Sequence, residues 1–94
     1  MYRDQVERDG VYLYELRVIG VQSATANAAF KRSFTVYRSG GATSILAVQS
    51  DYTFKTNASW GLSILNDGDV VVNVVGDDLA PINWVLSLTK TMGF

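Results

Sequence analysis

The chain has 94 residues and a mass of 10.3 kDa, which is the size of a single domain. Its 8 basic and 9 acidic residues leave a net charge of −1, so it lacks the basic excess typical of nucleic-acid binding or of a polybasic membrane anchor. It contains no cysteine and no histidine, which excludes disulfides, thiolate or imidazole metal sites, and catalysis by either side chain. We therefore expect no nucleic-acid partner and no cofactor.

Residues 1–9 are charged and lack the apolar stretch of a signal peptide. We predict that they form a lead-in, either frayed or folded as one helical turn, and that residues 10–94 form the domain. No apolar run reaches the roughly 18–20 residues of a membrane helix, so membrane insertion is not expected.

After Gly10 the apolar residues recur with a period of two, which is typical of strands that bury one face. Two long strands are predicted over residues 11–21 and 28–38. The side chains on their inward faces are Tyr12, Tyr14, Leu16, Val18, Phe30, Phe34 and Val36.

The second half of the chain continues as strands separated by turn residues. Shorter strands are predicted over residues 43–49, 52–54, 60–65, 70–75 and 82–89. Ser50-Asp51 predicts a turn, and the Asp67-Gly68 pair between two strands indicates a hairpin. About seven strands without helical periodicity predict an all-β fold, an antiparallel β-sandwich of the jelly-roll or immunoglobulin-like kind.

Some apolar residues lie on faces that alternation assigns to solvent, among them Val11, Leu13 and Ile19. Either the outer faces of a small irregular sandwich are covered locally, or they form a contact between subunits. A bulge that reassigns some of these positions is a third alternative. For the second interpretation the interface candidates are Leu65, Val71, Val75 and Val85.

Arg32 is unusual because alternation places it inward, between Phe30 and Phe34. Its stem can pack in the core while the guanidinium reaches the edge. Alternatively, Arg32 forms an ion pair with Glu15 on the neighbouring strand and supports the interface.

The remaining polar and aromatic motifs give weaker indications. The aspartate-rich turns at 67–69 and 77–78 are interpreted as solvated turns or as calcium ligands, although their spacing departs from the EF-hand pattern. Trp60 and Trp84 fall on inward positions and are predicted to pack in the core. Tyr37 and Tyr52 are the candidates for contact with a sugar ring. No catalytic set of residues is apparent, so we do not expect an enzyme.

A Val-x-Val-x-Gly run is followed by an Ile-x-Trp-x-Val strand near the end of the chain. With them, the characteristic segments are Tyr12–Gly20, Ala28–Phe34, the Ser39–Gly41 turn, Trp60, the Asp67-Gly68 turn, Val70–Gly76 and Ile82–Val85. The order of these features resembles the small β-sandwich modules of tailed-bacteriophage structural proteins, especially the distal parts of tail fibres and related virion appendages. The resemblance covers roughly Gly10 to Phe94.

The resemblance implies a non-enzymatic virion protein, made in the host cytoplasm, that self-associates around a threefold axis as a trimer. Its further partners would be other virion proteins and a glycan on the host surface. The alternatives are a capsid decoration or head-fibre protein and a monomeric carbohydrate-binding module.

Overall fold

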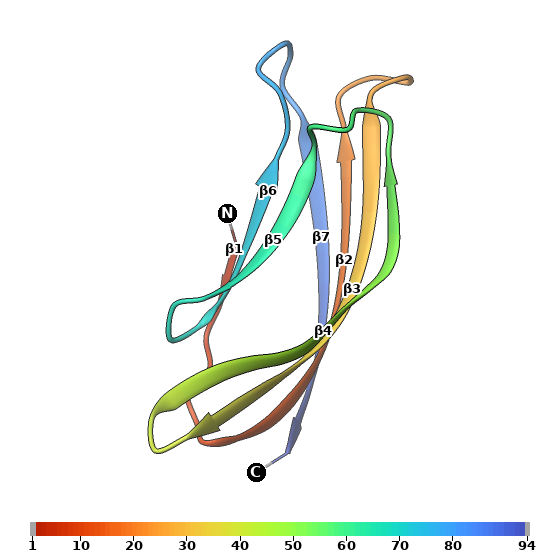
Figure 1. Ribbon diagram of the computed structural model, residues 1–94. Helices are drawn as coiled ribbons and strands as arrows, with labels where there is room; N and C mark the ends of the chain where they lie inside the picture. Colours follow the sequence, from red (N-terminus) through yellow and green to blue (C-terminus); the bar gives the residue numbers. More distant parts are fainter. Residues whose placement is uncertain (1, 94) are drawn as a thin grey trace.

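Alternating apolar and polar residues place β2 (Gly10–Val21) and β3 (Asn27–Ser39) beside each other as two long antiparallel strands. β7 (Asn83–Gly93) pairs with the other side of β2, and β4 (Ala42–Lys55) pairs with the other side of β3. The resulting sheet has the order β4-β3-β2-β7. These strands belong to a computed structural model that describes residues 2–93 (Figure 1).

The second sheet has the order β1-β6-β5. Its strands are β1 (Tyr2–Asp4), β6 (Val70–Val75) and β5 (Gly61–Asn66), and both of its pairings are antiparallel. The described chain is therefore an all-β protein of seven strands in two antiparallel sheets. The prediction of a sandwich is confirmed.

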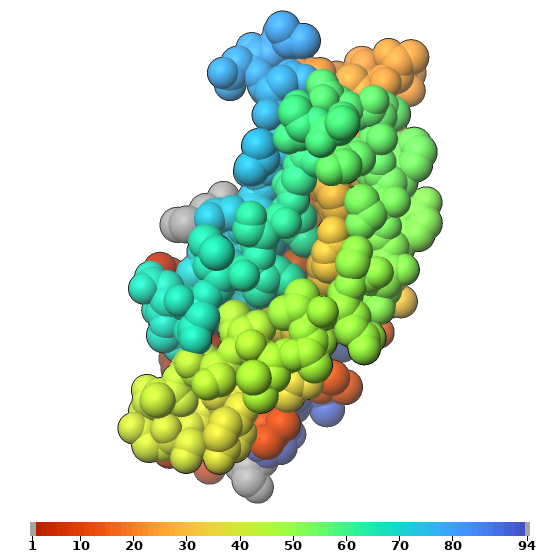
Figure 2. Space-filling view, in the orientation of Figure 1, coloured from red at the N-terminus to blue at the C-terminus, as the bar shows by residue number. Residues whose placement is uncertain are grey.

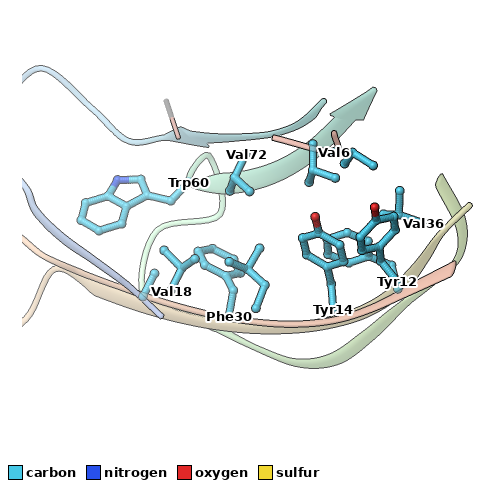
Figure 3. Packing of buried hydrophobic residues seen from close by; sticks show 12 residues of the cluster. Val6, Tyr12, Tyr14, Val18, Phe30, Val36, Trp60 and Val72 are labelled. Atoms are coloured by element: carbon cyan, nitrogen blue, oxygen red, sulfur yellow. The ribbon is translucent and has the colours of Figure 1, made fainter. Parts of the chain in front are cut away.

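The core lies between the two sheets, and the predicted inward faces of β2 and β3 supply most of it. The rings of Tyr14 and Phe34 stack with their centroids 5.0 Å apart. Val70 and Val72 of β6 belong to the same core cluster, and Figure 3 shows Val72 in the layer opposite Phe30. Trp60, which ends the connection before β5, is only 1% exposed. Burial of these large side chains supplies the main driving force for packing the layers.

β4 corrects the prediction of two short strands separated by a turn at Ser50-Asp51. The structure has a single strand of 14 residues. Its register with β3 shifts at two places, between Lys31 and Arg32 and between Ser33 and Thr35. Such β-bulges insert unpaired residues without ending the strand, which is why the sequence pattern loses its period here.

The N-terminal segment also differs from the prediction of a lead-in or helical turn. Residues 2–4 form β1, which pairs with β6, and Val6 is buried in the core. The Asp4 carboxylate accepts hydrogen bonds from the Tyr14 hydroxyl at 2.6 Å and from the Lys90 ammonium at 3.0 Å. Burial of Tyr14, together with its hydrogen bond to Asp4, raises the pKa of the Tyr14 hydroxyl far above its ordinary value. The segment is therefore an integral part of the sandwich.

Candidate interaction surface

The outer face of the four-stranded sheet carries most of the exposed large apolar side chains in the described part of the chain. Because successive side chains of a strand point to opposite faces, burying the inward set leaves the alternate residues on this outer face. Nine of the fifteen exposed large hydrophobic residues lie here, each 45–56% exposed. They are Val11, Leu13, Ile19, Val21, Tyr37, Leu46, Tyr52, Phe54 and Val85.

One apolar band crosses all four strands near one end of this face. Val85 of β7 lies opposite Ile19 of β2, Ile19 lies opposite Ala29 of β3, and Ala29 lies opposite Phe54 of β4. Tyr52 adjoins the band on β4, and a shallow depression of about 210 Å³ lies between Tyr52 and Ile19. A row of four register partners therefore makes a continuous apolar strip.

A second apolar band lies near the other end of the face. Leu13 is opposite Thr35, which is in turn opposite Leu46 of β4. The next outward pair along β2 and β3 is Val11 and Tyr37. Two apolar bands on one face thus enclose the more polar rows between them.

The rows between the bands carry charges of both signs. Arg17 and Glu15 form an exposed ion pair with a nitrogen–oxygen distance of 3.9 Å. Lys31 lies opposite Arg17, and the Ser33 hydroxyl donates a hydrogen bond to the Asp51 carboxylate at the β4 bulge. Two cations and two carboxylates leave this centre electrically balanced.

The interface candidates predicted from the sequence do not form one patch. Leu65 and Val75 lie on the three-stranded sheet, whereas Val85 lies on the outer face of the four-stranded sheet. Val71 is only 3% exposed, because Arg3 and Leu65 flank it on the adjacent strands. The expectation that Val71 faces solvent is therefore wrong.

The proposed ion pair between Glu15 and Arg32 does not form. Arg32 is the register partner of Leu16, so it lies on the face opposite to Glu15. Its guanidinium donates to the backbone carbonyls of Lys31 at 3.0 Å and Tyr52 at 2.8 Å, and lies 5.4 Å from the centre of the Phe30 ring. Burial lowers the pKa of Arg32. The alternative, a packed stem with a guanidinium that reaches the strand edge, agrees with these contacts.

Tyr37 and Tyr52 are exposed on the same face, but they do not form one platform. Tyr52 is opposite Lys31, six positions before Tyr37 on β3, a separation of about 20 Å at the strand rise. Each tyrosine instead belongs to a different apolar band.

The carboxylates of the aspartate-rich turn at 67–69 are bound by other groups of this chain. The Arg3 guanidinium contacts Asp67 at 2.7 Å and Asp69 at 3.2 Å. A hydrogen bond from the Val6 N–H, followed by that of Arg3, holds the pKa of Asp69 below its ordinary value. Within residues 2–93 no group of three or more acidic side chains is arranged to hold a metal ion.

Asp77 connects the β6–β7 loop to the core. Its carboxylate accepts hydrogen bonds from the Gln22 amide at 2.6 Å, from the Trp60 indole N–H at 3.1 Å and from the Leu79 N–H at 3.1 Å. The bond from Gln22 is the main reason that the pKa of Asp77 lies below its ordinary value.

This lowered pKa predicts a pH dependence of stability. A group with a lowered folded-state pKa stabilises the fold above its unfolded pKa, and that contribution is lost as the pH falls through the folded pKa. We therefore expect Asp77→Asn to lower the free energy of unfolding at pH 7. The difference from the parent should shrink as the pH is lowered from about 5 to 2, measured by urea unfolding.

The exposed Asp78 provides the matched control for Asp77→Asn, because Asp78→Asn removes the same charge in the adjacent position. We expect Asp78→Asn to leave the free energy of unfolding nearly unchanged, both at pH 7 and in the acidic range. Equal losses in the two variants would show that the net charge of the loop, and not the hydrogen bonds of Asp77, is responsible.

Comparisons with protein-family models, with curated proteins and with solved structures gave no match. Among residues 2–93 no helix is long and apolar enough to cross a membrane. The arrangement of residues on the outer face is therefore the basis for the functional proposal.

Proposed function

We propose that this chain is a non-catalytic structural module that self-associates through the outer face of its four-stranded sheet. The observation that carries the proposal is the concentration of nine half-exposed apolar side chains on that face. Isolated apolar side chains are ordinary on a protein surface, whereas a set that spans a whole sheet is typical of an interaction site.

The dimensions of the face suit an interface between proteins. Four strands at about 4.8 Å spacing and eleven register positions at about 3.4 Å give a flat area of about 720 Å². A stable interface of standard size buries roughly 800 Å² per partner, and projecting side chains raise the accessible area above the flat value. The face is therefore large enough to hold two subunits together.

The polar centre is compatible with a second copy of the same chain. Glu15 and Arg17 already pair, and Lys31 and Asp51 add one charge of each sign. Opposite charges on one face can meet their counterparts when two copies approach, so that self-association does not bury a net charge.

The virion setting of the proposal rests on the resemblance to tailed-phage modules. On that basis the module belongs to a tail fibre or another appendage, or to the capsid surface as a decoration or head fibre. The association would be trimeric, and its further contacts would be with other virion proteins and a host glycan.

The mass in solution tests self-association directly. Light scattering after size exclusion, at several concentrations, should give a stable mass near three times 10.3 kDa or a whole-number multiple of that trimer mass. A monomer at every concentration would contradict the proposal.

Ile19→Asp tests whether the outer face is the contact. Ile19 lies in the first apolar band and is 49% exposed, so the variant should fold normally. An unpaired charge buried in an interface costs about 3 kcal/mol or more, which raises the dissociation constant by about 100-fold. The expected result is dissociation to a lower mass in solution, with unchanged circular dichroism.

Val75→Asp is the matched comparison, because Val75 is 51% exposed but lies on the three-stranded sheet. Under the proposal it leaves the mass unchanged. Dissociation by Val75→Asp but not by Ile19→Asp would move the interface to the other sheet and refute the proposal.

A further inference from the structure

β7 is the edge strand of the four-stranded sheet, and its backbone pairs on one side only. The sheet order β4-β3-β2-β7 leaves β2 as its single partner among the described strands. The β2–β7 ladder runs through eleven consecutive pairs, from Val11 and Gly93 to Val21 and Asn83, without a register shift. The unpaired side of β7 is therefore regular along its whole length.

Proteins usually protect such an edge with bulges, prolines, unpaired charges or a covering segment. The opposite edge, β4, has two register shifts and a residue with positive φ, Ala47. β7 has neither a bulge nor a proline, and its one charged residue is Lys90. The Lys90 ammonium is already bound to the Asp4 carboxylate at 3.0 Å and the Gln5 carbonyl at 2.9 Å.

The two layers leave an apolar gap beside β7. A cavity of about 190 Å³ is lined by Trp84 and Leu86 of β7, Val18 of β2, and Tyr2, Val72 and Val74 of the other sheet. Trp84, Leu86 and Leu88 are only partly buried, although they face inward. A further strand beside β7 would place its own inward side chains next to this gap and bury more apolar surface.

From these observations we infer that β7 is a docking edge, and that it pairs antiparallel with β7 of a second copy. The second copy fits because β7 presents the same apolar inward face to itself and carries no free charge that would repel its twin. Such main-chain pairing at a sheet edge is a recurrent mode of recognition. The pair has twofold symmetry and is isologous.

The side chains favour a twofold axis at Ser87. In that register Leu86 lies opposite Leu88 of the second copy, so that apolar residues meet on the inward face. An axis at Lys90 would instead set two ammonium groups opposite each other. With the axis at Ser87, Asn83 lies opposite Thr91 of the second copy.

This inference uses a different surface from the outer face proposed above. The face can relate subunits around a threefold axis, while the β7 edge relates them in pairs. If both contacts form, two trimers are joined into a hexamer; the edge alone gives a dimer.

The absence of cysteine from the chain allows a direct test with single-cysteine variants. Ser87→Cys should form a disulfide-linked dimer about tenfold faster than Ser50→Cys, because a disulfide needs closely approaching Cβ atoms. Ser50 is a control at the β4 bulge, and its register partner Arg32 lies on the inward side of the sheet. A short bifunctional thiol reagent should give the same order of rates. Asn83→Cys and Thr91→Cys should each cross-link slowly with themselves, since equivalent positions are about 27 Å apart.

The mixture of Asn83→Cys and Thr91→Cys provides the decisive sample. Antiparallel pairing about Ser87 brings these two positions together, so the mixed dimer should form faster than either homodimer. If every β7 variant cross-links no faster than Ser50→Cys, the inference is overturned.

The two proposals fail in different ways. An oligomer that Ile19→Asp dissociates, together with slow β7 cross-linking, would support the outer face and refute the edge. Fast cross-linking of Ser87→Cys, with a mass that Ile19→Asp does not change, would support the edge and refute the outer face. A monomer without cross-linking would refute both.

Discussion

Trp60→Ala should lower the free energy of unfolding by about 4 kcal/mol, the cost typical of removing a large buried aromatic side chain. Trp60 is 1% exposed, and its ring lies 5.9 Å from that of Trp84. In Figure 3 it occupies the end of the core away from Tyr12 and Val36. Its removal would leave a cavity between the layers and would also remove the indole N–H that donates a hydrogen bond to the Asp77 carboxylate.

Urea unfolding at a matched protein concentration measures this loss, because self-association would otherwise add to the apparent stability. Trp60→Phe is the comparison: it keeps most of the ring volume but removes the indole N–H, and should cost about 1–2 kcal/mol. A loss below about 1 kcal/mol for Trp60→Ala would contradict the assignment of Trp60 to the core.

Gly20→Ala should lower the free energy of unfolding by about 2 kcal/mol through overpacking. Gly20 of β2 is the register partner of Trp84 on β7, and the indole lies across it. A Cβ atom added at Gly20 would lie 2.4 Å from the nearest indole carbon. The ring must therefore move away from the position where it covers the core.

Gly61→Ala is the control for this substitution. Gly61 begins β5, and an added Cβ there would have no heavy atom within 4 Å. We expect Gly61→Ala to leave stability unchanged or to raise it slightly, because alanine restricts the unfolded chain. If the clash with Trp84 causes the loss at Gly20, Gly20→Ala should cost less in a Trp84→Leu background.

β4 and β7 are the two edge strands of the four-stranded sheet, and they differ in regularity. In Figure 2 β4, coloured yellow-green to green, runs along one side of the molecule, and its residues from Leu46 to Lys55 are all exposed. Its bulges interrupt the edge, whereas β7 continues without a shift beside β2. The two edges therefore differ in the regularity of their backbone, although both are long.

The long strands and their buried faces could be predicted from alternation alone. Tyr12, Tyr14, Phe34 and Val36 lie inward as predicted, and each is at most 2% exposed. The Asp67-Gly68 turn also forms, with Gly68 at a φ of 75°, a conformation that glycine adopts without steric cost. These features are local, because they depend on a period of two or on one pair of residues.

The bulges in β4 and the role of the N-terminus could not be predicted in this way. A bulge breaks the period of two, so the sequence pattern around Ser50 predicts a turn instead of a continuous strand. β1 has only three residues, too few to show a period, and its strand conformation depends on the partner that β6 provides.

The all-β class, the exclusion of cysteine and histidine chemistry, and the inward faces of the long strands follow from the order of the amino acids alone. The tertiary structure is needed to establish which outward residues lie together. It united Ile19 with Val85 and Phe54 on one sheet and separated Leu65 and Val75 onto the other. The physical reason is that alternation assigns residues to a face within one strand, while the order and register of strands depend on contacts between distant segments.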